Sequence, residues 1–474
     1  MLSNIFFWTT LTLYIVLILS TVVIITLENR QPAKTIAWIL AIVALPVVGF
    51  VFFLIFGQNL KKEHTINRHH YRQLLRRLRN RQMPERLANL PEKYFQLIQL
   101  CAKTMGALPT ASNTLQMLPS GADYMQALLR DIAAAKNFVL IETYIIEDDA
   151  VGRLLSDALA EKASQGVAVY LIYDDVGCWR VPQKFFRRLE RGGIKVEAFM
   201  EVRFPSLTSK VNYRNHRKLC VIDGTTSYVG GMNFALRYVS HAQTTWYDLQ
   251  LRIEGTASLS LQHIFMADWQ FASGREIPAS LFAHEPETTV NEGPVVQMLT
   301  SSPASQYPEL MYALTWALQN ARRYVYIQTP YFMPTEPVLQ ALETAALMDV
   351  DVRIMLPMRP DGKWLKWANE SYFSELLHAG IKIYRCTDGF LHAKMVVIDD
   401  DWCTIGSSNI DFRSFENNFE VGAVIYDKDT ALEARRFFES NLPHCKELKY
   451  AEWKRRPFGH KWAESATRIM APLF

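Results

Sequence analysis

Residues 391–409 read LHAKMVVIDDDWCTIGSSN, and residues 215–233 read NHRKLCVIDGTTSYVGGMN. Both stretches follow the pattern H-x-K-x4-D-x6-G-[GS]-x-N, which begins at His216 in the first copy and at His392 in the second. Each copy puts a histidine two residues before a lysine and just ahead of an apolar run. In an extended strand this spacing points both side chains to one face. An imidazole beside an ammonium group and asparagine amides is a combination that can bind and attack a phosphate.

The two motifs end two similar runs of alternating strands and helices. Strands are expected at 138–144, 167–173 and 194–198 and again at 324–331, 352–356 and 380–384; helices are expected at 150–165, 185–191, 336–347 and 375–379. Strand, helix and strand segments of this length predict an α/β fold with helices on both faces of a sheet. The repetition predicts two duplicated α/β domains that pack as a pseudo-twofold pair, with their motifs meeting.

The N-terminus carries two long uncharged runs, Ile5–Leu27 and Ile36–Gly57. The first would be about 35 Å long as a helix, enough to cross a bilayer with some tilt. A signal peptide is the rival interpretation, but no lysine or arginine precedes the run and a second apolar run follows it. Two transmembrane helices are therefore expected, at about 5–27 and 36–57, with Pro46 kinking the second.

A basic segment follows directly, with nine Lys or Arg and two Glu between residues 61 and 86. The local charge of +7 leaves about −3 for the rest of a chain whose net charge is +4. By the positive-inside rule this segment lies on the cytoplasmic side. It could lie on anionic headgroups or form a solvated linking helix, and both alternatives stay open. Because the body is slightly acidic, the charge distribution does not suggest a nucleic-acid binder.

These features divide the chain into four parts. We expect two transmembrane helices in 1–60, a basic juxtamembrane linker in 61–110, a first α/β domain in 111–285 and a second in 286–474. Basic and apolar residues alternate in the tail from Lys454 to Phe474. This tail could form an amphipathic helix that touches a membrane or a helix that docks on the body.

The remaining composition does not indicate a metal or a cofactor. The six cysteines are scattered without a C-x-x-C spacing, so a disulfide framework or a zinc site is not expected, and reduced, mostly buried thiols are. The acidic pairs 148–149 and 174–175 each stand at the end of an expected strand, without a third ligand nearby in the sequence.

The paired motifs resemble those of the phospholipase D superfamily. The apolar N-terminal runs with Pro46 and Gly49, together with TPYF at 329–332 and NIDFRSFENNFE at 409–420, resemble bacterial cardiolipin synthases of the two-span, membrane-anchored type. The resemblance covers nearly the whole chain.

This resemblance implies phosphatidyl transfer between two phosphatidylglycerol molecules, giving cardiolipin and glycerol through a covalent phosphohistidine. It implies no nucleotide, cofactor or metal, membrane phospholipid as the partner, no nucleic acid, and a multi-pass protein of the bacterial inner membrane with its catalytic body on the cytoplasmic side. The alternatives are a phospholipase D-type hydrolase and a phosphatidyltransferase that uses another alcohol; the oligomeric state stays open.

The resemblance also assigns roles within the motifs. The catalytic set comprises His216, Lys218, Asp223, His392, Lys394 and Asp399. His216 takes the role of nucleophile and His392 that of acid and base, although the residues alone do not separate them because the repeat is nearly symmetric. The two aspartates lie at an odd offset from their lysines, so we expect them to face away and to hold the following turn.

Supporting roles fall to five further residues. Asn233 and Asn409 are expected to donate amide hydrogen bonds to a phosphate. Ser407 stands where the first copy has Gly231, so a hydroxyl donor to phosphate is expected from one half only. The family pattern places an acid downstream of each histidine in its own copy, Asp248 in the first and Glu420 in the second, to set the imidazole tautomer.

Overall fold

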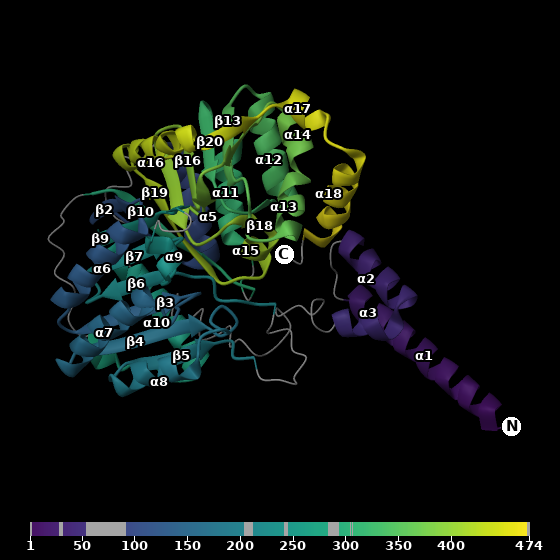
Figure 1. The fold of residues 1–474 in the computed structure, drawn as a ribbon, viewed down its shortest axis with the longest axis horizontal. Helices are drawn as coiled ribbons and strands as arrows, with labels where there is room; N and C mark the ends of the chain where they lie inside the picture. The colour runs from purple at the N-terminus through teal and green to yellow at the C-terminus, as the bar shows by residue number, and fades with distance from the viewer. Residues whose placement is uncertain are drawn as a thin grey trace. The chain divides into compact units, whose positions relative to one another are not determined.

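The computed structural model describes residues 2–27, 32–53, 92–202, 212–240, 245–282, 293–303, 305 and 307–471. The chain divides into an N-terminal unit of helices and a body that holds both motifs (Figure 1). The basic segment at 61–86 lies outside the described residues.

The N-terminal unit begins with one long apolar helix, α1 (Leu2–Leu27). Within it, Ile5–Leu27 is long and apolar enough to cross a membrane, and no other helix among the described residues meets both conditions. The first predicted span is therefore present as a single helix.

The second apolar run is interrupted at the proline expected to kink it, and neither of its two helices is by itself long enough to cross a membrane, so the second span over 36–57 stays a prediction. The run forms α2 (Pro32–Ala44) and α3 (Pro46–Phe52), separated at Leu45, whose φ of −138° and ψ of 72° are not helical. The break has the cause the sequence indicated, because a proline disfavours the helical conformation of the residue before it. The helix α3 folds back on α2, where a Cβ at Gly49 would overlap the carbonyl group of Ala41. Residues 54–57 lie outside the described part.

The first half of the body is built on one mixed sheet with the strand order β2-β9-β7-β6-β3-β4-β5. Its strands are β2 (Asn113–Leu118), β3 (Phe138–Thr143), β4 (Ala168–Asp174), β5 (Lys195–Phe199), β6 (Leu219–Ile222), β7 (Thr226–Gly230) and β9 (Gln250–Gly255). Its helices are α6 (Gly121–Ala134), α7 (Ala150–Ser164), α8 (Gln183–Arg191), α9 (Leu236–Val239) and α10 (Ala257–Ser273). The run β3-β4-β5 is parallel and the other pairs are antiparallel.

The second half repeats this order as β10-β19-β17-β16-β11-β13-β14, with β1 and β20 added at the edges. Its strands are β10 (Val295–Ser301), β11 (Tyr324–Gln328), β13 (Asp351–Pro357), β14 (Lys382–Cys386), β16 (Met395–Ile398), β17 (Trp402–Gly406), β19 (Glu420–Tyr426), β1 (Pro109–Thr110) and β20 (Cys445–Leu448). Its helices are α11 (Glu309–Gln319), α12 (Glu336–Leu347), α13 (Lys363–Glu370), α14 (Phe373–His378), α15 (Phe412–Glu416), α16 (Lys428–Asn441), α17 (Tyr450–Lys454) and α18 (Phe458–Met470). The predicted duplication is confirmed strand by strand.

Both sheets are covered by helices on both faces, as predicted. In β4, Leu171 joins the apolar core formed with α6, α7 and α8, while its neighbour Tyr170 contacts Trp269 of α10, with ring centroids 4.8 Å apart. In β11, Ile327 likewise joins the core with α11 and α12, while Tyr326 contacts Phe438 of α16 at 4.8 Å. Alternate residues of a strand face opposite sides, so each sheet is buried on both.

Residues 92–110 do not form part of a linker, which corrects the boundary expected at 110. The helix α5 (Glu92–Met105) buries Tyr94, Leu97 and Ile98 in the core of the second half, and β1 pairs with β10. These side chains recur at helical spacing on one apolar face, which packs on a sheet whose main strands begin some 200 residues later, at β10.

The two halves are joined by short backbone pairings beside the motifs. The strand β8 (Thr245–Tyr247) of the first half runs parallel to β15 (Gly389–Leu391) of the second, just before the second motif. Asn215, just before the first motif, forms an isolated bridge with Phe419. The motifs therefore meet across the junction of the two halves.

Candidate active site

Each histidine–lysine pair occupies an extended segment that leads directly into a central strand, β6 in the first half and β16 in the second. The spacing of two brings each lysine back to its own histidine. Nζ of Lys218 donates to the carbonyl oxygen of His216 at 2.7 Å, and Nζ of Lys394 donates to that of His392 at 2.6 Å. Both ammonium groups are thereby fixed beside an imidazole, as the sequence predicted.

The carboxylates that contact the two histidines come from the opposite halves. Nδ1 of His216 lies 2.9 and 3.1 Å from the two carboxylate oxygens of Glu420. Nδ1 of His392 lies 2.6 Å from Oδ2 of Asp248. The pairing expected within each copy is therefore wrong, and the two halves complete each other's histidine.

Backbone hydrogen bonds explain the crossing. The N–H of His216 donates to the carbonyl of Phe419 at 2.9 Å, and the N–H of His392 donates to that of Tyr247 at 2.7 Å. In each case the acceptor is the residue just before the carboxylate. The same junction that joins the halves therefore delivers a carboxylate from one half to the imidazole of the other.

The serine that breaks the motif symmetry contacts the carboxylate. Oγ of Ser407 donates a short hydrogen bond to Oε2 of Glu420 and accepts from the N–H of Val421 at 3.0 Å. In the first half, a Cβ at Gly231 would overlap the carboxylate of Asp248. The expectation of a hydroxyl donor to phosphate is corrected, since Ser407 is fully buried and fixes Glu420.

The two motif aspartates hold the backbone, as expected, but ahead of the motif and not at the turn that follows it. The carboxylate of Asp223 accepts from three consecutive N–H groups at residues 136–138, at 2.7–2.8 Å. Asp399 does the same at residues 322–324, at 2.8–3.1 Å. Each aspartate thus anchors the start of the neighbouring strand, β3 or β11.

The two motif asparagines differ in how far their amides are used. Oδ1 of Asn233 accepts from the N–H of Ile145 at 3.0 Å, and its Nδ2 donates to the hydroxyl of Tyr238 at 2.6 Å. Oδ1 of Asn409 is buried and has no hydrogen-bond partner within the described part of the chain. Because the oxygen and nitrogen of such an amide are placed by their hydrogen bonds, Asn409 can turn its nitrogen to an acceptor.

Burial holds both imidazoles neutral at pH 7. It lowers the pKa of His216 to about 4, although Glu420 acts in the opposite direction. Burial and then the charge of Lys394 lower the pKa of His392 to about 3. With Nδ1–H donated to a carboxylate, each neutral ring keeps the lone pair of Nε2 for another partner. A neutral imidazole of this tautomer is a nucleophile or a general base.

Burial also weakens the charge of both lysines. It lowers the pKa of Lys218 to about 7 and that of Lys394 to about 8, against the raising effect of the nearby carboxylates. Although burial opposes ionisation of Asp248 and Glu420, the hydrogen-bonded histidine and the nearby lysine keep the pKa of each carboxyl below its usual range. Below pH 7 the site is therefore a compact set of two cations and two anions, and Lys218 is the first of the four to lose its charge as the pH rises.

The residue between His216 and Lys218 belongs to the site, and sequence reasoning missed it. Arg217 is fully buried, forms an ion pair with Asp268 of α10, and donates from Nε to the backbone carbonyl of Glu420 at 3.1 Å. It therefore fixes the backbone of the carboxylate that contacts His216. An arginine immediately before an apolar strand was the available signal.

Aromatic rings surround the histidines unevenly, which the sequence also did not reveal. The ring of Tyr144 lies 5.0 Å from that of His216. The rings of Tyr238 and Trp246 lie 5.5 and 5.3 Å from that of His392. These rings exclude water from both imidazoles and most strongly from the second.

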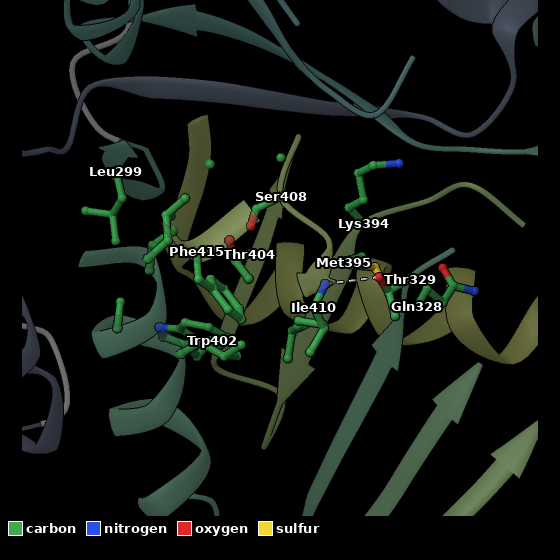
Figure 2. Close-up of a pocket in the computed structure, with 17 residues that line it drawn as sticks. Leu299, Gln328, Thr329, Lys394, Met395, Trp402, Thr404, Ser408, Ile410 and Phe415 are labelled. Carbon is green, nitrogen blue, oxygen red and sulfur yellow. Dashed lines mark hydrogen bonds between the residues drawn. The ribbon is translucent and has the colours of Figure 1, made fainter. Parts of the chain in front are cut away.

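A cavity of about 50 Å³ lies beneath the second motif (Figure 2). Its walls are mostly apolar side chains of the second half, among them Leu299, Trp402 and Phe415, and Lys394 stands at its edge. The cavity therefore adjoins the site on one side only.

The described residues hold no group of three or more His, Cys, Asp or Glu side chains arranged to bind a metal ion. The acidic pairs noted in the sequence have structural partners. Asp149 caps α7 by accepting from the N–H groups of Val151 and Gly152. Asp174 accepts from the N–H groups of Gly177 and Asn215 at 2.8 and 2.9 Å.

Two family models match the chain. The model described as cardiolipin synthase, phospholipase D-like domain, matches residues 128–269 and 314–442. The model described as phospholipase D-nuclease N-terminal matches residues 15–58, which include the second half of the first apolar run and all of the second.

Curated relatives match along nearly the whole chain. The major cardiolipin synthase ClsA of Bacillus subtilis (strain 168) is 35% identical over 474 residues, which cover 97% of this chain and 98% of that protein. A cardiolipin synthase of Alkalihalophilus pseudofirmus is 35% identical over 476 residues, which cover 98% and 94%. Among solved structures, the phosphatidylserine synthase of Haemophilus influenzae Rd KW20 matches with a TM-score of 0.62 at 17% identity, over 80% of this chain and 100% of that one. The last match shows a shared fold.

Proposed function

Since the chain belongs to the cardiolipin synthase family of phospholipase D-like enzymes, we propose that it transfers a phosphatidyl group from one phosphatidylglycerol to the terminal glycerol hydroxyl of a second. The products are cardiolipin and glycerol. The observation that carries the proposal is the pair of histidine–carboxylate contacts, crossed between the halves, with a buried lysine beside each. This arrangement supplies one nucleophile, one proton carrier and two cations at a single phosphate.

In the first step, Nε2 of His216 attacks the phosphorus of the donor lipid. A P–N bond forms, the P–O bond to the terminal glycerol breaks, and His392 gives its proton to the departing alkoxide. In the second step, His392 takes the proton of the acceptor hydroxyl, whose oxygen attacks phosphorus as the P–N bond breaks. One phosphodiester is lost and one is formed, so the exchange needs no nucleotide to drive it.

We assign the nucleophile to His216 because its imidazole is held more firmly. Both carboxylate oxygens of Glu420 lie within hydrogen-bond distance of its Nδ1, and Ser407 and Arg217 in turn fix Glu420. A nucleophile that is held in the attack geometry avoids part of the entropy cost of the transition state. His392 has one carboxylate oxygen of Asp248 at its Nδ1.

The two lysines and Asn409 would stabilise the charge that gathers on the non-bridging oxygens of the five-coordinate phosphorus. Fixed donors in a buried site are effective because they need little reorganisation during the reaction. Lys218 and Lys394 are almost fully buried, with 2% and 3% of their surface exposed. Asn233 has a supporting role, since its amide holds Ile145 and Tyr238.

Charge balance accounts for the proton on His392. When both lysines are charged they cancel the two carboxylates, and burial keeps both imidazoles neutral. A phosphodiester brings one negative charge into this buried site, and one proton restores neutrality. We infer that His392 takes up that proton when the donor lipid binds, because the phosphate offers Lys394 a stronger partner than the imidazole ring 3.1–3.2 Å from its Nζ.

For the membrane, we propose a multi-pass arrangement in which both 5–27 and 36–57 cross the bilayer and the body lies on the cytoplasmic side. The long helix α1 and the net positive charge of residues 61–86 support it. Because α3 folds back on α2 in this structure, a crossing by 36–57 requires the break at Leu45 to open in the bilayer, where a proline-broken span is tolerated if neighbouring helices cover it. Membrane-impermeant labelling of a cysteine introduced at residues 28–31 would mark that loop from outside intact cells, and labelling only after lysis would contradict the arrangement.

The test of the reaction uses the purified full chain in phosphatidylglycerol vesicles without added metal. Cardiolipin and glycerol should appear in a one-to-one ratio. Phosphatidic acid without cardiolipin would contradict the transferase and indicate the hydrolase. If cardiolipin forms only when a second phospholipid is added, that lipid is the phosphatidyl donor and phosphatidylglycerol is only the acceptor.

A further inference from the structure

The C-terminal helix α18 is amphipathic, but its polar face packs on the body and its apolar face points to solvent. The face that packs on the body is polar, with Glu464 and Thr467 only 2% and 1% exposed. Both carboxylate oxygens of Glu464 accept from Nε of Arg456, at 2.8 and 2.9 Å. Arg468 extends this contact through an ion pair with Glu375 at 2.9 Å. The helix is thus attached to the body by charged groups.

The opposite face of α18 is apolar and points to solvent. Phe458 is 81% exposed, Trp462 66% and Ile469 82%. Their spacings of four and seven residues place them in one stripe along the helix. A surface helix of a soluble protein normally turns such a stripe to the core, so this orientation needs a partner outside the chain's own core.

The surroundings of the stripe favour an anionic lipid surface as that partner. Lys454, Arg455 and Lys461 are exposed at the start of α18 and just before it. Tryptophan and phenylalanine beside basic residues are typical of helices that lie at the headgroup level of a bilayer. With 13 residues, α18 is only about 20 Å long and too short to cross a membrane.

The helix belongs to the second half of the body. It packs on α13 (Lys363–Glu370), and Arg468 pairs with Glu375 of α14. A lipid surface at α18 would therefore lie beside the second half of the body.

We propose that the exposed stripe of α18 lies in the headgroup region of an anionic bilayer, as a membrane contact separate from the N-terminal helix. This contact would hold the second half of the body on the surface from which its lipid substrates come. The proposal concerns binding and does not depend on the reaction being cardiolipin synthesis.

The full chain in vesicles of phosphatidylethanolamine and phosphatidylglycerol, with a trace of phospholipid carrying a diazirine in its acyl chain, provides the test. After illumination, mass spectrometry of the peptides should find lipid on α1 and on residues 457–470, and not on the peptide around Leu154, which is 51% exposed on α7. Labelling of α1 without α18 would overturn the proposal. Crosslinking of α18 to a second copy of the chain would overturn it in favour of a protein interface.

A triple variant separates insertion from chance contact. In Phe458→Ser/Trp462→Ser/Ile469→Ser, labelling of residues 457–470 should fall at least fivefold while labelling of α1 is unchanged. The matched control Leu154→Ser/Trp179→Ser removes two exposed apolar side chains of the first half and should leave α18 labelling as it was. An unchanged signal in the triple variant, with an unchanged thermal transition, would also overturn the proposal.

Discussion

The two halves of the body share one strand order but differ directly beneath their motifs. In the first half, Glu142, Asn215 and Arg217 form a buried polar network, in which Asn215 donates to Glu142. The register-equivalent residues of the second half are Gln328, Leu391 and Ala393. Burial keeps the pKa of Glu142 well above its usual range, and the nearby Asp268 adds to this effect.

The space around this layer differs as well. Tyr228 and Gln250 are fully buried in the first half, and their register equivalents in the second half are Thr404 and Gly422. Both smaller residues line the cavity of about 50 Å³ beneath Lys394.

We infer that the two halves of the body have specialised for different roles. The first half holds its histidine still through a hydrogen-bonded and ionic network, which suits a nucleophile. The second half leaves Lys394 at the edge of a cavity and its histidine beside aromatic rings, which suits a group that gains and loses a proton. Variants of each half can test whether the two histidines differ in this way.

Replacing each histidine separately should give opposite trapping patterns. Both His216→Asn and His392→Asn should lower cardiolipin synthesis by roughly 10³–10⁴-fold or more, since a nucleophile or a general acid is lost. With phosphate-labelled donor lipid, His392→Asn should accumulate a covalent phosphatidyl-protein and His216→Asn should not. The reverse pattern would exchange the two roles. His263→Asn on α10 is the control for the loss of a histidine outside the site.

Removing each carboxylate should reproduce the defect of the histidine in the other half. Asp248→Asn should behave like the loss of His392, and Glu420→Gln like the loss of His216, each at a cost of roughly 10²–10⁴-fold in kcat because the amide favours the wrong tautomer. The readout is again the trapped adduct, which should persist in Asp248→Asn. If each variant instead resembled the loss of the histidine in its own half, the crossed contacts would not operate in catalysis.

The serine and glycine that differ between the motifs should not be interchangeable. Ser407→Ala removes a hydrogen bond to the Glu420 carboxylate, worth about 1.5–3 kcal/mol, so kcat should fall roughly 10- to 100-fold. Gly231→Ala places a Cβ against Asp248 and should also lower kcat, through His392. Steady-state rates at saturating lipid measure both, and Ser408→Ala, next to Ser407, is the matched control. Full activity in Ser407→Ala would mean that Glu420 needs no such support.

Much of this architecture could be predicted from the sequence, because apolar runs and helical spacing record which faces are buried. The strands and helices around residues 138–198 and 324–384 follow from that signal. Pro46 indicated a kink in the second membrane run, but it did not indicate that α3 would fold back on α2. The helix at 92–105 was also missed, because the main strands of the sheet it packs on begin only about 200 residues later.

The motif residues were predictable, but their contacts were not. Spacing along the chain places Lys218 beside His216, since both belong to one segment. It does not record which of two similar halves supplies a carboxylate, so the partners of Glu420 and Asp248 were predicted wrongly. Likewise, nothing in the spacing distinguishes a serine that faces a phosphate from one that faces Glu420.

The two lysines should set the alkaline limit of activity, one after the other. With pKa values of about 7 for Lys218 and about 8 for Lys394, both are charged at low pH and lose their charge as the pH rises through those values. The value of kcat/KM, which reports the free enzyme, should therefore fall above pH 7. Lys218→Arg keeps its charge, so the alkaline fall of its kcat/KM should move towards pH 8. The ratio of its kcat/KM to that of the parent chain should change severalfold between pH 7 and 9. An alkaline fall that does not move would assign the titration to another group.

The smallest effect concerns the cavity of the second half and should appear in stability. A Cβ at Gly422 would lie 3.6 Å from both Leu310 and Thr404, in ordinary contact, and would fill part of the cavity. Gly422→Ala should therefore raise the free energy of unfolding by about 1 kcal/mol, through the added contact and the lower entropy of the unfolded chain. Gly406 lines the same cavity, but a Cβ added there would overlap the carbonyl of Val421. Gly406→Ala should therefore lower the thermal midpoint of unfolding. If both variants destabilised the protein equally, the second half would be packed as tightly as the first, and the looser packing inferred beneath Lys394 would have to be abandoned.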